Sequence, residues 1–326
     1  MILTHSVKMF ISEIPKVTSN HLNFLKINNM RKSLKYLTIV CLSWLCLSCK
    51  NEKKPSENVL DKPIVKIEKK NITGYIKAPM GSIYYEDNGQ GGLPVVFVHS
   101  FAGSTMHWQA QVAHLQKDRR VITLDLRGHG RSDAPNKMNY TVESLATDIA
   151  AVVDSLNINR FVLVGHSLGG AAAIAYAGAH PERVAGLLLA GTSGKSSEKE
   201  AKPILYSLDK DYEKVMEDYT KQLLTNAKPP VEALQREGMK HLSKETSITI
   251  IKAIFEFDPL SLLNRYEGPK LIVSTPDENQ PNALNKQMPK IPHKVITGTS
   301  HWMQMDKPEE FNQILDAFLK TVNGEK

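Results

Sequence analysis

The sequence predicts an α/β protein with a mostly parallel central sheet, helices on both faces and a helical insertion. From about residue 94 to residue 190, short apolar runs alternate with helical segments. Such runs are typical of fully buried strands, and their alternation with helices is typical of a parallel sheet with covered faces. Between about residues 194 and 264 the alternation stops, and the chain has a helical composition.

The expected strands are apolar runs bounded by turn residues: Ile72–Ile76, Ser82–Glu86, Pro94–Val98, Val121–Leu124, Phe161–Val164, Val184–Leu189, Lys270–Val273 and Lys294–Ile296. The first two flank a Pro-Met-Gly turn and are expected to form an antiparallel pair. Two expected helices, Val142–Leu156 and Pro308–Val322, show apolar residues at helical spacing. The others are expected from their helical composition: Met106–Leu115, Leu205–Thr225, Pro230–Leu242 and Ser247–Phe257. We therefore expect one domain over residues 71–326, with a helical cap at about 194–264 above the carboxyl edge of the sheet.

The net charge of +7 does not indicate a nucleic-acid partner, because of where the charge lies. Residues 1–70 carry 13 Lys and Arg against 5 Asp and Glu, whereas the remaining 28 basic and 29 acidic residues nearly cancel. A groove for phosphates would need a basic excess on the folded body. A hydrophobic content of 41% is that of a globular protein.

Residues 1–49 are predicted to be a leader that resembles a bacterial lipoprotein signal. A basic head begins at Met30, which we expect to be the true start, and is followed by a short apolar run over 36–48. Cys49 would carry the lipid, although Cys46 stands where an aliphatic residue is usual. The Lys-rich stretch 50–70 reads as a tether. We expect an exported protein held on a bacterial membrane, with an uncleaved signal-anchor helix as the alternative. All three cysteines lie in this leader, which leaves no disulfide framework and no thiolate metal site in the body.

The segment Gly165-His166-Ser167-Leu168-Gly169 follows an expected strand and precedes a helix rich in small residues. This is the context of a nucleophile elbow, a turn so tight that the residues flanking the serine must be small. The alternative is an ordinary glycine-rich turn between a strand and a helix.

With three further motifs in register, the chain resembles the α/β-hydrolase family over most of residues 72–322. The motifs are His99-Ser100-Phe101-Ala102-Gly103 after the third strand, Asp125–Ser132 after the fourth, and Gly298–Trp302 before the last helix. A serine hydroxyl needs a base and a group that orients the base, and the resemblance implies His301 as the base. Asp277, which follows the strand ending at Val273, is the expected acid, with Glu278 as the nearest substitute.

The resemblance implies an oxyanion hole made by the backbone N–H groups of Phe101 and Leu168. Ser100 departs from the family pattern, which usually has glycine there. The remaining motif residues are expected to be structural: His99, Asp125, Arg127, His129 and His166.

A serine at the elbow implies acyl transfer, because dehalogenases and epoxide hydrolases of this family use a carboxylate there. Hydrolysis of small apolar or aromatic carboxylic esters is the expected reaction, with Trp108 and Trp302 at the substrate pocket. Cleavage of carbon–carbon bonds, amides, peptides or lactones, and perhydrolysis, remain open on the same residues, as does a non-catalytic binding role. No cofactor, no metal and no nucleic-acid partner is expected, and the sequence leaves the oligomeric state open.

Overall fold

The computed structural model describes residues 71–135 and 139–324. The predicted leader, the predicted lipidation site Cys49 and the predicted tether lie outside the described residues. Within the described part, no helix is long and apolar enough to cross a membrane.

An eight-stranded sheet forms the centre of the domain, in the order β1-β2-β4-β3-β5-β6-β7-β8. The strands are β1 (Ile72–Ala78), β2 (Gly81–Asn88), β3 (Val95–Val98), β4 (Val121–Leu124), β5 (Phe161–His166), β6 (Val184–Ala190), β7 (Lys270–Ser274) and β8 (His293–Val295). β1 pairs with β2 and β2 with β4 in antiparallel fashion, and all other pairs are parallel. The predicted mostly parallel sheet is confirmed, and the loops after β3, β5, β6 and β7 meet at one edge.

The two faces of the sheet bury alternate residues of each strand, as the period of two requires. In β3, Val96 and Val98 pack into the apolar cluster on one face, while Val95 and Phe97 pack into the cluster on the other. The first face is covered by α2 (Val142–Ser155), α3 (Leu168–Ala179) and α8 (Pro259–Arg265). The second is covered by α1 (Gln109–Leu115), which follows the short 3-10 helix η1 (Thr105–Trp108), and by α11 (Pro308–Asn323). Both faces are therefore closed to water, as the continuous apolar strands predict.

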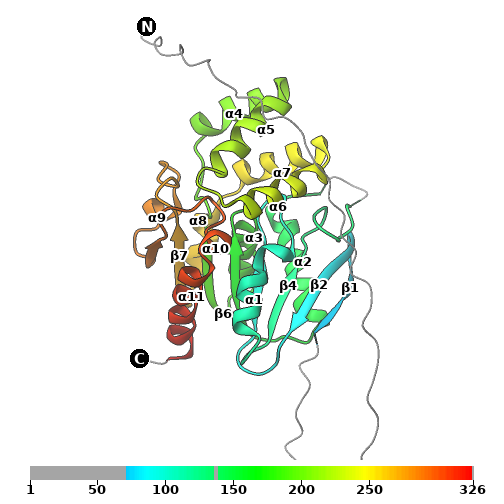
Figure 1. Ribbon diagram of the computed structural model, residues 1–326, viewed down its shortest axis with the longest axis vertical. Coiled ribbons are helices and arrows are strands. Elements are labelled where there is room, and N and C mark those ends of the chain that lie inside the picture. The colour runs from blue at the N-terminus through cyan, green and yellow to red at the C-terminus, as the bar shows by residue number, and fades with distance from the viewer. Residues whose placement is uncertain (1–70, 136–138, 325–326) are drawn as a thin grey trace, which may run out of the picture. The chain divides into compact units, whose positions relative to one another are not determined.

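Four helices from the inserted segment gather above one end of the sheet (Figure 1). They are α4 (Glu198–Lys210), α5 (Tyr212–Leu223), α6 (Pro229–Lys240) and α7 (Lys244–Glu256). The single helix expected over 205–225 is two helices, because the Asp211 side chain accepts a hydrogen bond from Lys214 N and starts α5 anew. Two short helices that the sequence analysis did not predict, α9 (Leu284–Gln287) and α10 (Met303–Asp306), flank the last strand.

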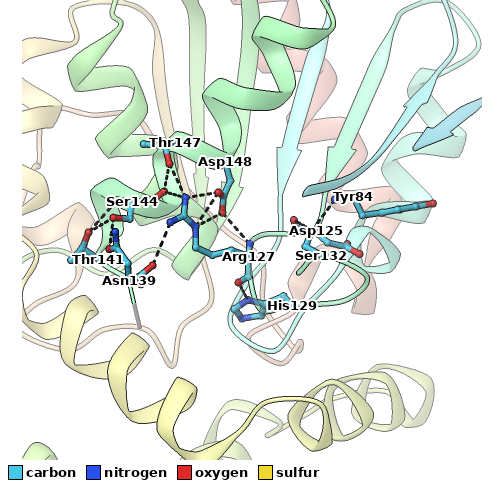
Figure 2. A network of polar contacts seen from close by, with 10 residues as sticks. All are labelled: Tyr84, Asp125, Arg127, His129, Ser132, Asn139, Thr141, Ser144, Thr147 and Asp148. Atoms are coloured by element: carbon cyan, nitrogen blue, oxygen red, sulfur yellow. Dashed lines mark hydrogen bonds and ion pairs between the residues drawn. The ribbon is translucent and has the colours of Figure 1, made fainter. Parts of the chain in front are cut away.

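A buried ion pair fixes the segment after β4 to α2 (Figure 2). Arg127 is 1% exposed, and its Nε lies 3.0 Å from both carboxylate oxygens of Asp148. The Arg127 Nη2 also donates to Ser144 O at 2.6 Å and to Thr147 Oγ1 at 2.7 Å. Burial raises the pKa of Asp148, whereas its hydrogen bonds to Arg127 act in the opposite direction. With its guanidinium directed at α2, Arg127 has the structural role that the sequence analysis expected.

Asp125 lies in the same segment, and its carboxylate accepts hydrogen bonds from backbone N–H groups. Its Oδ1 accepts from Thr105 N at 2.6 Å, and its Oδ2 accepts from Arg131 N at 2.8 Å. The carboxylate therefore holds the start of η1 against the turn after β4. This use agrees with the structural role predicted from the motif.

Candidate functional site

Ser167 is the single residue between β5 and α3, and its backbone is strained. Its φ of 53° and ψ of −115° lie in a backbone region that is disfavoured for residues other than glycine. The turn leaves no space for side chains on either side of it. A Cβ at Gly165 would lie 2.5 Å from Gly169 O, and a Cβ at Gly169 would lie 2.4 Å from His99 O. The sharp turn predicted at Ser167 is therefore present, and the two glycines allow it.

His301 lies in the loop between β8 and α10, with its side chain largely buried. Its Nδ1 forms a hydrogen bond with the carboxylate of Glu278. Because the carboxylate oxygen accepts, Nδ1 carries the proton and Nε2 of a neutral ring has a free lone pair. His301 N also donates to Leu223 O, at the end of α5, at 3.0 Å.

The acid beside His301 is Glu278, and not the expected Asp277. A tight turn follows β7, in which Glu278 N donates to Thr275 O at 3.2 Å and Glu278 Oε2 accepts from Thr275 N at 2.9 Å. This turn directs Glu278 toward the sheet edge and leaves Asp277 exposed. Gly191, after β6, makes room for the pair, because a Cβ there would lie 2.9 Å from both Glu278 Oε1 and His301 Cε1.

His166 packs beside His301, with ring centroids 4.6 Å apart. Its Nε2 lies 3.0 Å from the carbonyl oxygen of His301 and must donate to it, while Gln304 Nε2 donates to His166 Nδ1 at 3.2 Å. Burial lowers the pKa of His166 well below its usual value, so the ring stays neutral in the folded protein. The residue expected to pack thus also holds the backbone of His301.

The loop after β3 carries Phe101, the expected oxyanion residue, into the same pocket as Ser167. His99 fixes this loop, with its Nδ1 donating to Ser100 O at 2.7 Å and its Nε2 accepting from Leu126 N at 2.9 Å. The departure at Ser100 has a function, since its Oγ accepts from Trp302 Nε1 at 3.0 Å and joins this loop to the histidine loop. Leu168, the other expected residue, opens α3, where backbone N–H groups have no acceptor within the helix.

The carboxylate of Asp306, at the end of α10, joins the histidine loop to the cap. Its Oδ2 accepts from Ser300 N at 2.9 Å, and its Oδ1 accepts from Lys228 N, just before α6, at 2.8 Å. Asp306 is 1% exposed. The sequence analysis did not single out this residue.

The two tryptophans expected at the pocket have different surroundings. Trp302 lines the pocket with Ser167 and His301. Trp108 does not: it is fully buried on the α11 face of the sheet, with ring centroids 4.8 Å from Phe97 and 6.0 Å from Phe311. The indole thus belongs to the apolar core on that face and not to the pocket, which corrects the prediction for Trp108.

The pocket above Ser167 is also lined by cap side chains that the sequence analysis did not identify: Met216, Tyr219, Thr220 and Leu223 of α5, with Gln235 and Met239 of α6. Their spacing of three and four residues marks one face of each helix. The volume is only about 20 Å³, room for about one water molecule. A ligand much larger than a water molecule would fit beside Ser167 only if cap side chains or helices moved.

Among residues 71–135 and 139–324, no three His, Cys, Asp or Glu side chains are grouped so as to hold a metal ion.

Known proteins resemble the chain over most of its described part. A family model described as alpha/beta hydrolase fold matches residues 94–228. The dihydrolipoyllysine-residue acetyltransferase component of the acetoin cleaving system of Pseudomonas putida is 30% identical over 254 residues, which cover 73% of this chain and 66% of that protein.

Two further similarities extend over nearly the whole length of the other protein. The 3-oxoadipate enol-lactonase 2 of Acinetobacter baylyi is 26% identical over 254 residues, covering 74% of this chain and 94% of the enzyme. A solved structure described as an N-acyl homoserine lactone degrading enzyme has a TM-score of 0.66 at 25% identity, covering 75% of this chain and 100% of that chain. By contrast, this chain spans 30–66% of the length of four other curated relatives.

The strain at Ser167 predicts a stability difference between two substitutions. Ser167→Gly should raise the free energy of unfolding by about 1 kcal/mol, because relief of about 1–3 kcal/mol of strain exceeds the entropy that glycine adds to the unfolded chain. Ser167→Ala retains a Cβ, and hence the strain, and is the matched control. Urea unfolding of the three proteins measures the difference. Equal stabilities of the Gly and Ala variants would contradict the strained turn.

Buried histidines predict that the protein loses stability in acid. Burial lowers the pKa of His99 to about 4 and those of His107 and His129 to about 3. In the unfolded chain their pKa values are about 6.5. Between pH 6.5 and pH 4 the unfolded state therefore binds more protons, and the free energy of unfolding falls as the pH falls.

Urea unfolding at pH values from 7.5 to 4.5 measures this loss. His129→Gln removes one of the groups that take up a proton on unfolding. It should therefore reduce the slope of the unfolding free energy against pH by about 1.4 kcal/mol per pH unit. His241→Gln replaces an exposed side chain and should leave the slope unchanged. An identical slope in wild type and His129→Gln would count against a neutral, buried His129.

Proposed function

The chain belongs to the α/β-hydrolase family, and from this we propose that it is a serine hydrolase that cleaves carboxylic esters through an acyl-enzyme on Ser167. One observation carries the proposal: Ser167, on its strained turn, and His301, hydrogen-bonded to Glu278, line the same pocket. A serine, a base and an acid that orients the base are the parts that nucleophilic acyl transfer needs.

In the proposed reaction, His301 Nε2 takes the proton of Ser167 Oγ as the oxygen attacks the ester carbonyl. Glu278 accepts the Nδ1–H hydrogen bond, keeps the ring in the required tautomer and stabilises the imidazolium that forms. The negative oxygen of the tetrahedral intermediate is stabilised by the N–H groups of Phe101 and Leu168, each such donor being worth about 10²–10³ in rate. The imidazolium then protonates the leaving alcohol, and water releases the acid by the reverse sequence.

The apolar lining of the pocket favours substrates with apolar acyl groups. Met216, Leu223, Met239 and Trp302 contribute mainly apolar surface around Ser167. Burial of this surface against an acyl chain would supply binding free energy of about 25 cal/mol per Å².

Lactones are a second candidate class of substrate. A lactone is a cyclic ester and uses the same attack by serine. The similarity to 3-oxoadipate enol-lactonase 2 over 94% of that enzyme favours this class. A substrate panel of p-nitrophenyl esters and simple lactones separates the two.

Substitution of the proposed nucleophile tests the function. Ser167→Ala should lower kcat on p-nitrophenyl butyrate by a factor on the order of 10⁶, as loss of the serine does in other triads. A fluorophosphonate probe should label the wild-type protein and leave Ser167→Ala unlabelled. Wild-type turnover in the Ala variant would exclude Ser167 as the nucleophile, and a wild-type protein with neither turnover nor labelling would indicate a binding role.

The choice of acid is tested by a matched pair of neighbours. Glu278→Gln keeps the size of the side chain but favours the wrong tautomer of His301, and it should lower kcat by about 10⁴-fold. Asp277→Asn, one residue earlier on the same turn, should keep nearly wild-type kcat because Asp277 is exposed. Ester hydrolysis at pH 8 measures both, and the opposite ranking would restore Asp277 as the acid.

A further inference from the structure

Gln235, on the cap helix α6, connects the cap to the loop that carries Phe101. Its side chain is 3% exposed and lies in the wall of the pocket with Ser167. Its Nε2 donates to the carbonyl oxygen of Phe101 at 3.2 Å. A carbonyl oxygen only accepts, so the amide nitrogen must face Phe101, and the orientation of the amide is thereby fixed.

This orientation leaves the other end of the amide without a partner. Gln235 Oε1 is buried and forms no hydrogen bond with any of the described residues. A buried acceptor without a donor is costly, and a donor that reaches it regains that free energy. Met216, Leu223 and Met239 line the same pocket and have no group that donates a strong hydrogen bond. Tyr219 and Thr220 also line it and carry hydroxyl groups, but neither hydroxyl donates to Gln235 Oε1.

A close backbone contact fixes Gln235 relative to the reacting groups. Gly238, three residues later on the same helix, approaches the loop so closely that a Cβ there would lie 1.9 Å from Ala102 O. Residues three apart lie on the same side of a helix. The register of α6 against the Phe101 loop is therefore fixed, and so is the position of the Gln235 amide, which is one hydrogen bond away from the carbonyl of the proposed oxyanion residue Phe101.

We propose that Gln235 selects substrates with a hydrogen-bond donor, a hydroxyl or an amide N–H, close to the scissile carbonyl. The inference rests on the proposed ester hydrolysis and specifies its substrate class. A site that hydrogen-bonds a substrate group rejects the analogue without that group far more strongly than an apolar pocket rejects a change of one methylene.

Two pairs of esters of equal shape test the proposal. In the acyl half, each enantiomer of p-nitrophenyl 3-hydroxybutyrate is compared with p-nitrophenyl 3-methylbutyrate. In the alcohol half, 2-hydroxyethyl butyrate is compared with propyl butyrate, with proton release as the readout. Wild type should favour the hydroxylated member of at least one pair by about tenfold or more in kcat/KM, and Gln235→Met should abolish the preference.

The ratio within a pair separates the two uses of the Gln235 amide. Gln235→Met also frees the carbonyl of Phe101, which lowers kcat/KM for both members of a pair and cancels in the ratio. Met239→Leu, one turn along the same wall, is the control and should keep the wild-type ratio. If Gln235→Met does not fold, Gln235→Leu carries the same comparison.

Two results would overturn the role of Gln235 alone: hydrolysis of these esters without a preference in either pair, or a preference that survives in the Gln235 variant. A wild-type protein that hydrolyses none of the esters and is not labelled by the fluorophosphonate overturns the proposed function itself.

Discussion

The left-handed backbone of Ser167 is the constraint on which the rest of the site depends. A strand can pass directly into a helix there only because Gly165 and Gly169 have no side chains. The turn costs about 1–3 kcal/mol, and the packed sheet and helices around it supply that free energy. As a result, the Ser167 hydroxyl is held at the edge of the sheet where strands β3, β6 and β7 also end.

Around that turn, two neutral histidine rings form hydrogen bonds with backbone groups of the neighbouring loops. His99 ties the Phe101 loop to Leu126, and His166 holds the carbonyl of His301. Each ring donates with one nitrogen and accepts with the other, which only the uncharged form can do. Their burial thus serves the same purpose as their hydrogen bonds, because both keep the proton that each ring carries in one place.

The residue pattern was sufficient to predict the parts of the structure that depend on local chemistry. Continuous apolar runs located the buried strands, and Gly-x-Ser-x-Gly between a strand and a helix located the turn at Ser167. The choice between Asp277 and Glu278 depended on a turn in which adjacent side chains face opposite ways, which spacing along the chain does not specify. Trp108 and Trp302 each lie close in sequence to a motif, whereas tertiary contacts determine whether each indole packs in the pocket or against the face of the sheet.

The cap was the least predictable part for a physical reason. Its helical composition predicted the presence of helices, but composition does not say which apolar residues face Ser167 and which face one another. Gln235 and Asp306 are polar, and the hydrogen bonds through which they connect the cap to the rest of the site join segments about 80 to 130 residues apart. Such contacts cannot be read from the local sequence.

The double attachment by Asp306 has a mechanical consequence. One carboxylate binds both the histidine loop and the start of α6, and His301 N binds the end of α5. The link between α5 and α6 is thus anchored at both of its ends to the element that carries the base. The end of α5 and the start of α6 are therefore the part of the cap that is tied to the histidine loop, so cap movement that admits a molecule larger than water would fall mainly on the helices outside this link, α4 and α7.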